Sequence, residues 1–208
     1  MDLQYYGANC LVLSNKDARL VIDDTLAALG LKSVAKAGDI AAFTGPHDIV
    51  HAAARLVIDG PGEYEVSNLS IVGIAAQAHT DDPGTKRATI YKIMTDDATY
   101  LSVGHINPDL NDDQLEAIGM IDVLFVPVGG NGYTLDAGGA LQLIRKIEPK
   151  IVVPTHYADA AIRYPVVQQP LETVLKNLAM EPKDTTAKLR FKRADAADTT
   201  QLIVLTRS

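Results

Sequence analysis

The sequence predicts an α/β (α+β) fold, an αββα sandwich in which two mixed β-sheets pack face to face with helices outside. Three observations predict it: short β-runs in both halves, two strands that are apolar throughout, and three amphipathic helices late in the chain. Because each apolar face must be buried against another element, strand-rich halves that carry helices favour two packed sheets. With 208 residues, 47% of them hydrophobic, the chain fits a single domain over residues 1–208.

Runs of β-forming residues between turn residues predict the strands. Residues 3–6, 10–13 and 19–22 form a meander joined by GAN and SNKDA turns. The runs at 121–126 and 151–153 are continuously apolar, which is typical of strands covered on both faces. Further strands are expected at 40–43, 55–58, 69–74, 88–94, 99–103, 187–191 and 201–206.

Three segments have the end signals and the periodicity of amphipathic helices. Residues 111–118 begin with Asn and Asp, 136–147 follow a Gly-rich loop, and 170–180 begin with Pro. The apolar positions that recur on one face are Leu141, Ile144 and Ile147 in the second helix and Leu171, Val174, Leu175 and Leu178 in the third.

Charge and cysteine usage limit the partners and the compartment. A net charge of -7 and a pI of about 5.1 argue against a nucleic-acid partner, because phosphate neutralisation needs a basic face. The basic run at 188–193 is expected to be the solvated face of a late strand. One cysteine, Cys10, allows no internal disulfide and is expected to be a buried, inert thiol. Without a signal peptide or a membrane-length apolar run, we expect a cytoplasmic protein that acts on a small molecule, alone or as a homo-oligomer.

Six short motifs follow one another along the chain. They are VIDD, GPGEYEV, AHTDDPGTKRATIYKI, YLSVGHI, IDVLFVPVGG and VVPTHY. In this order they resemble the metallo-β-lactamase superfamily, and most of all its compact branch of bacterial metal-dependent hydrolases. The resemblance implies a metallo-β-lactamase-like fold and a hydrolase that uses zinc or a similar divalent ion.

The main metal-binding motif of that family is degenerate in this sequence. Family members carry H-x-H-x-D-H after a strand-end Thr or Ser, whereas Thr44 is followed by GPHDIVH, so that only His47 matches. His105 stands where the family has the Asp that bridges two metals, and Ala8 stands where close relatives have His. A dinuclear site is therefore not expected, and the site is at most mononuclear.

Three other histidines each lie just past a predicted strand. His79, His105 and His156 would form a three-imidazole zinc site that leaves one position for water. With His47 as a fourth ligand, the site would be closed and structural. The alternative is that these histidines only hydrogen-bond to one another and to water. His51 is expected to be a loop residue rather than a ligand.

Other residues are candidates for supporting roles. Asp23 is expected to accept backbone N–H groups from a neighbouring loop. Tyr133 and Tyr157 are candidates for binding a substrate oxyanion, with a buried structural role as the alternative. Arg87 is the candidate for recognising an acidic substrate group. Weaker replacement ligands are Asp24 and Asp48, and the glycines at 129–139 are expected to form a tight strand-to-helix turn.

Two classes of function remain open. The first is a metal-dependent hydrolase with a mononuclear site, acting on an ester, lactone or phosphoester bond. The second is a non-catalytic binding or interaction module, a pseudoenzyme on the same fold. The degenerate motif favours the second class and the strand-end histidines favour the first, because function resides in the site rather than in the fold. No catalytic residue is assigned.

Overall fold

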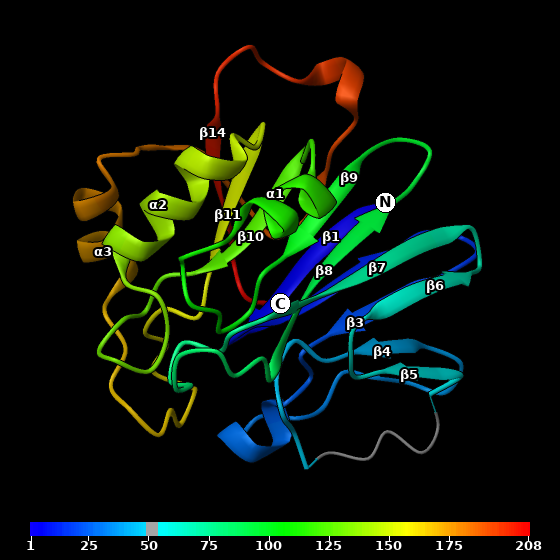
Figure 1. Cartoon of the computed structure of the whole chain (residues 1–208), viewed down its shortest axis with the longest axis horizontal. Helices are drawn as coiled ribbons and strands as arrows, with labels where there is room; N and C mark the ends of the chain where they lie inside the picture. Colours follow the sequence, from blue (N-terminus) through cyan, green and yellow to red (C-terminus); the bar gives the residue numbers. More distant parts are fainter. Residues whose placement is uncertain (49–53) are drawn as a thin grey trace.

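Two β-sheets and three α-helices make up the computed structural model, which describes residues 1–48 and 54–208 (Figure 1). The six-stranded sheet has the order β13-β1-β2-β3-β4-β5. Its strands are β1 (Asp2–Gly7), β2 (Cys10–Ser14), β3 (Arg19–Ile22), β4 (Ile40–Ala42), β5 (Leu56–Ile58) and β13 (Leu189–Arg190). The eight-stranded sheet has the order β12-β14-β11-β10-β9-β8-β7-β6. Its strands are β6 (Gly62–Val66), β7 (Leu69–Ala76), β8 (Ala88–Met94), β9 (Thr99–Ser102), β10 (Val123–Pro127), β11 (Ile151–Thr155), β12 (Pro182–Thr186) and β14 (Gln201–Leu205).

Both sheets are mixed, so the predicted fold class is confirmed. In the smaller sheet, β1, β2 and β3 pair antiparallel, and β3, β4 and β5 pair parallel. In the larger sheet, β6 to β9 form an antiparallel meander, and β9, β10, β11, β14 and β12 are parallel. The parallel strands therefore direct their carboxyl ends to the same edge of the molecule.

The main core lies between the two sheets. Leu3 and Tyr5 of β1 are buried while their neighbours are half-exposed, the alternation of a strand with one buried face. Strand β10 has a buried residue at every position. Phe125 belongs to the core between the sheets and Leu124 to the core under the helices, which confirms that this strand is covered on both faces.

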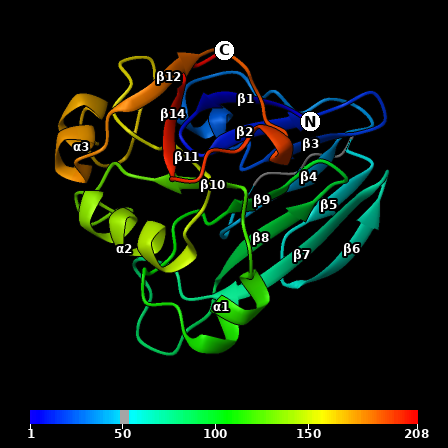
Figure 2. The same ribbon diagram turned by 90° about the horizontal axis from the view of Figure 1, so that it is seen from above.

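The three predicted helices are confirmed and lie on the outer face of the eight-stranded sheet (Figure 2). They are α1 (Asp112–Ile118), α2 (Ala137–Ile147) and α3 (Leu171–Leu178). Helix α1 begins with a capping box, in which Asn111 and Gln114 each accept the other's backbone N–H. Helix α2 begins where the Asp136 carboxylate accepts the N–H of Gly139, 2.8 Å away.

The outer face of the six-stranded sheet has a different cover. Its apolar cluster consists of Cys10, Val12, Val21 and Leu26, packed under the 3₁₀ helix η1 (Leu26–Leu29) and the following loop. No α-helix lies on this face within the described parts of the chain. Cys10 is fully buried there, as predicted.

Two strands near the C-terminus differ from the sequence-based expectation. Strand β12 was not predicted, because PKDTT is polar and mostly exposed and lacks the alternation of a half-buried strand. It is an edge strand that pairs parallel with β14. The strand predicted at 187–191 is reduced to β13, Leu189–Arg190.

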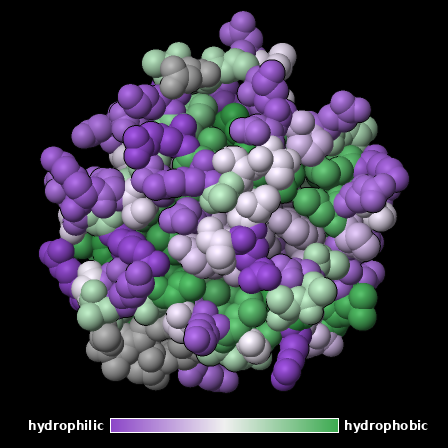
Figure 3. All heavy atoms as spheres, turned by 180° about the vertical axis from the view of Figure 1, so that it is seen from behind, coloured by the Kyte–Doolittle hydropathy of each residue, from purple (hydrophilic) through white to green (hydrophobic). Residues whose placement is uncertain are grey.

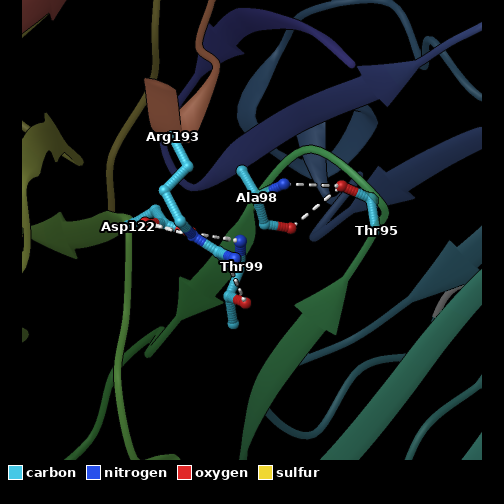
Figure 4. Close-up of polar contacts among 5 residues, drawn as sticks. All are labelled: Thr95, Ala98, Thr99, Asp122 and Arg193. Atoms are coloured by element: carbon cyan, nitrogen blue, oxygen red, sulfur yellow. Dashed lines mark hydrogen bonds and ion pairs between the residues drawn. The ribbon is translucent and has the colours of Figure 1, made fainter. Parts of the chain in front are cut away.

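Basic side chains of the run at 188–193 form ion pairs with aspartates that lie in or next to the strands. Lys188 and Arg190 form ion pairs with Asp2. Arg193, which begins the 3₁₀ helix η2 (Arg193–Asp195), binds the Asp122 carboxylate through its Nε and a terminal nitrogen (Figure 4). The same carboxylate accepts the backbone N–H of Thr99 at 2.8 Å, so it joins β9 to the C-terminal segment.

The surface shows no membrane-spanning element in what the structure describes. None of the described helices is long and apolar enough to cross a membrane. The large apolar side chains that are most exposed are Val57, Met120 and Val167. On the face in Figure 3, apolar residues are interspersed with hydrophilic ones.

Candidate functional site

A cavity of about 210 Å³ lies where the carboxyl ends of strands from both sheets meet. Asn9 follows β1, Asp23 follows β3, His105 follows β9 and His156 follows β11, and all four line the cavity. Loops at strand ends converge on a rigid scaffold, which is where binding and catalytic residues concentrate. Tyr133, from the loop after β10, lines it as well.

Three non-glycine residues around this cavity have a left-handed backbone. The φ angles are 49° at Ala8, 51° at Asp23 and 53° at His156. Such conformations are costly for residues with a Cβ atom, and they cluster at functional sites. The cavity is therefore the candidate functional site.

His105 and His156 are packed directly against each other. Their ring centroids are 4.5 Å apart with the planes at 83°, and the ring of Tyr133 lies 5.2 Å from that of His105. Burial is the main cause that lowers the pKa of His105 to about 3, and the nearby His156 and His79 lower it further. Burial also lowers the pKa of His156, to about 4. Both imidazoles are therefore neutral at neutral pH.

Gln168 determines how His156 is oriented. Oε1 of Gln168 lies 3.2 Å from Nδ1 of His156, and both side chains are buried. Gly129 allows this approach, because a Cβ atom there would overlap both Oε1 of Gln168 and the His156 carbonyl. The buried pair thus depends on the Gly-rich loop, which forms the predicted strand-to-helix turn before α2.

His79 is held next to His105 through the backbone. Its N–H donates to the His105 carbonyl at 2.7 Å. The Nδ1 atoms of His79 and His105 are both buried and have no hydrogen-bond partner in the described structure. Such unpaired buried nitrogens are rare and are compatible with binding a metal or a ligand.

His47 is not among the residues that line the cavity. Its ring stacks on Phe43 at 3.5 Å, and it lines a neighbouring pocket of about 350 Å³ that also includes Asp59 and Arg87. Asp48 is exposed. His51 lies outside the described residues.

The donor groups of the described residues can be compared with what a metal site requires. Neutral imidazoles with unpaired nitrogens have the right chemistry for zinc. However, within residues 1–48 and 54–208, no three or more His, Cys, Asp or Glu residues are grouped so that they could hold a metal ion. The three-histidine site therefore stays a prediction.

Asp23 has a structural partner in Thr44. Its carboxylate accepts the Thr44 backbone N–H at 2.7 Å and the Thr44 hydroxyl at 2.6 Å, which matches the expected contact with a neighbouring loop. Burial raises the pKa of Asp23 to about 6, against the two hydrogen bonds from Thr44. The neighbouring Asp24 accepts N–H groups from Val34 and Ala35, so its Oδ2 serves the loop rather than the cavity.

The remaining candidates lie away from the cavity. The Tyr157 hydroxyl donates to the Leu205 carbonyl at 3.3 Å, and its ring packs 5.7 Å from that of Tyr5. Arg87 is paired with the carboxylate of Asp81, which occupies its guanidinium. Of the three residues predicted to bind substrate, only Tyr133 lines the cavity.

Sequence reasoning missed two polar residues of this site. Asn9 is the last residue of the predicted GAN turn, and it is buried in the wall of the cavity. Gln168 lies in the irregular segment before α3, twelve residues after His156. Asn9 has no sequence pattern that marks it. For Gln168 the signal is a Gln beside two valines in the segment after a strand-end His.

The fold and the cavity define a two-sheet protein with its site at the strand ends. A family model described as the beta-lactamase superfamily domain matches residues 2–156, and the chain belongs to this family. A UPF0173 metal-dependent hydrolase from Thermoplasma acidophilum is 41% identical over 46 residues, which are 21% of this chain and 20% of the relative. Another from Enterococcus faecalis is 36% identical over 69 residues, 31% of this chain and 29% of that protein.

Solved structures share the fold over nearly the whole chain. A metallo-β-lactamase superfamily protein from Thermotoga maritima has a TM-score of 0.77 at 21% identity and covers 98% of this chain and 97% of its own. A metallo hydrolase from Ignicoccus hospitalis has a TM-score of 0.63 at 18% identity, with 92% and 99% covered. At these identities the likeness shows the fold alone. The matched segments of the two sequence relatives are less than a third of their lengths.

Proposed function

We propose that this chain is a non-catalytic relative of metal-dependent hydrolases, in which the strand-end cavity binds a small molecule. The observation that carries the proposal is the arrangement of donors, since the described His, Cys, Asp and Glu residues form no group of three suited to a metal. The degenerate motif after Thr44 agrees with it. The lone buried Cys10 suits a reducing compartment such as the cytoplasm.

The packing of the histidines supports the same proposal. The rings of His105 and His156 contact each other edge to face, and the nearby Tyr133 ring completes an aromatic wall. His47 is stacked on Phe43 in a separate pocket, so it does not add a donor to this wall. A cavity lined by neutral rings is suited to binding a ligand.

A second candidate is a hydrolase with a single divalent ion such as zinc. One specific observation favours it: the buried Nδ1 atoms of His79 and His105 have no hydrogen-bond partner in the described structure. The names of the sequence relatives point the same way. A dinuclear centre is not proposed, because two adjacent ions need an anionic bridge and His105 stands where the family has that carboxylate.

Metal content separates the two candidates. The protein would be produced with added zinc, dialysed, and measured by elemental analysis beside the variants His105→Ala and His47→Ala. Our proposal predicts a small fraction of one equivalent in all three proteins. One equivalent that is lost in His105→Ala and kept in His47→Ala would establish the second candidate instead.

Hydrolysis assays complete the comparison. Generic ester, lactone and phosphodiester substrates would be tested with zinc at several pH values. Our proposal predicts no turnover above background, and turnover that His105→Ala abolishes would contradict it. Two equivalents of metal per chain would contradict both candidates.

A further inference from the structure

We infer that the cavity takes a small uncharged ligand, of the primary amide type, that accepts a hydrogen bond from Asn9 and donates one to Nε2 of His156. The inference rests on the proposed binding function and deepens it by naming the chemical class of the ligand. It follows from three features of the described wall: an unpaired donor, an oriented acceptor, and the lack of a cationic side chain.

The unpaired donor is the amide nitrogen of Asn9. Asn9 is 6% exposed and lines the cavity. Its Oδ1 accepts a hydrogen bond from the Thr155 hydroxyl at 2.9 Å. Its Nδ2 is buried and has no partner in the described structure. Because buried donors are almost always paired, this unpaired N–H group calls for an acceptor such as a ligand carbonyl oxygen.

The oriented acceptor is Nε2 of His156. Nε2 of Gln168 donates to the Val166 carbonyl at 2.7 Å, so the oxygen of the same amide is the end that faces His156. This oxygen can only accept, and therefore Nδ1 of His156 carries the proton. The neutral ring then has its lone pair on Nε2, where it can accept an N–H or O–H from a ligand.

The charge of the wall disfavours ionised ligands. The described lining includes no Lys or Arg that could neutralise a carboxylate or a phosphate. The carboxylate of Asp23, which could attract a cation, has both oxygens engaged by Thr44. An anion entering this cavity would lose its hydration without gaining a counter-charge, which is costly. An ammonium ion could approach Asp23, but it has no lone pair that accepts the Asn9 N–H.

The size of the cavity limits the ligand to a small molecule. Its volume of about 210 Å³ is below the roughly 300–1,000 Å³ of typical ligand pockets. Leu29 and Phe43 provide apolar surface for a short hydrocarbon part. A primary amide with a short alkyl chain combines a carbonyl acceptor, N–H donors and an apolar tail within this size.

The test compares three probes of nearly the same shape: propionamide, propionate and propylammonium. Binding to the metal-free full chain would be followed by NMR, from the Asn9 amide and His156 ring signals. We expect saturable shifts with propionamide and at least about tenfold weaker binding of both ions. In Asn9→Leu, propionamide binding should fall by about tenfold, whereas Asn177→Leu on the exposed face of α3 should bind it as the wild type does.

A second variant covers the case in which Asn9→Leu fails to fold. Asn9→Asp keeps the shape but replaces the N–H donor with an acceptor, so it should also lose propionamide binding. Tighter binding of either ion, no binding of any probe, or unchanged binding in Asn9→Asp would overturn the inference. A metal-free, inactive protein with those results would leave the proposed binding function standing. A stoichiometric metal ion would instead overturn the proposed function itself.

Discussion

Oε1 of Gln168 lies 3.2 Å from Nδ1 of His156, and this contact decides which ring nitrogen carries the proton. The donor end of the Gln168 amide is already used by the Val166 carbonyl. His156 must therefore donate from Nδ1, because two acceptors facing each other would repel. Gln168 is a positioning residue, since it acts on the ligand only through His156.

Replacing Gln168 by Leu should remove the contact that holds the neutral His156 ring in one tautomer. The ring should then populate both neutral forms, and its pKa should fall further below about 4, since the hydrogen bond to Gln168 raises it. The ¹⁵N chemical shifts of the His156 ring report the tautomer directly. The loss of a buried hydrogen bond should also cost about 1–2 kcal/mol of unfolding free energy.

A matched control for this change is Gln142→Leu. Nε2 of Gln142 donates to the Asp109 carboxylate at 2.7 Å on the exposed side of α2. Its replacement should leave the His156 spectrum unchanged. If Gln168→Leu gave the same ¹⁵N shifts as the wild type, Gln168 would have no positioning role.

Gly104 should not tolerate a side chain. Its φ angle is +58°, and a Cβ atom would overlap both Oγ1 and Cβ of Thr44. Gly104→Ala should therefore destabilise the chain by about 2–4 kcal/mol, from backbone strain plus overpacking. Gly84 has a φ angle of +87° but open space around it. Gly84→Ala should therefore lower the unfolding free energy by the backbone strain alone, about 1 kcal/mol. Urea unfolding measures both, and equal losses would contradict the packing argument.

The fold could be predicted because its signals are local. The apolar runs of β10 and β11 and the end signals of α1 and α2 specify elements that pack in the way the residues indicate. Strand β12 could not be predicted, because its exposed residues are held by pairing with β14 rather than by burial. Edge strands of this kind have no hydrophobic pattern to detect.

The site could be predicted only in part. Strand-end histidines mark where loops meet, and His105 and His156 do meet. Pairing within the site depends on contacts between distant segments, such as Asn9 with Thr155. The direction of a side chain after a strand depends on backbone conformations such as the left-handed one at His156, which the sequence does not reveal.

Cys10 should be inert in the folded protein. It is fully buried, and burial raises the pKa of its thiol well above the usual value, so the reactive thiolate is scarce. We expect no reaction with Ellman's reagent in buffer and rapid stoichiometric reaction in urea. A native rate close to the denatured rate would mean that the apolar cover over β2 opens readily.

Acid should destabilise the chain through its two cavity histidines. Burial lowers the pKa of His105 from 6.5 to about 3 and that of His156 to about 4. The unfolded chain therefore binds protons more tightly than the folded chain below pH 6.5. The stability that these two histidines contribute is fully present above pH 6.5. It is lost as the pH falls to about 4 for His156 and to about 3 for His105. The unfolding free energy should drop by several kcal/mol over this range.

Asp23 should partly offset this loss of stability at low pH. Burial raises its pKa from 3.8 to about 6, so between these values the folded chain binds the proton more tightly. Its contribution is present below pH 3.8 and is lost as the pH rises through about 6, a difference of about 3 kcal/mol at about 1.4 kcal/mol per pH unit. Asp23→Asn keeps an oxygen for the Thr44 N–H and removes this titration.

The variant Asp23→Asn should therefore lose stability more steeply than the wild type on acidification. Urea unfolding at pH 6.5 and pH 4 would measure the difference between the two proteins, which should change by about 2–3 kcal/mol in favour of the wild type at the lower pH. The exposed Asp184 in β12 offers a matched control, because Asp184→Asn should give a profile parallel to the wild type. Parallel profiles for Asp23→Asn as well would mean that Asp23 ionises in the folded chain as readily as in water, and that the Thr44 hydrogen bonds offset the whole effect of burial.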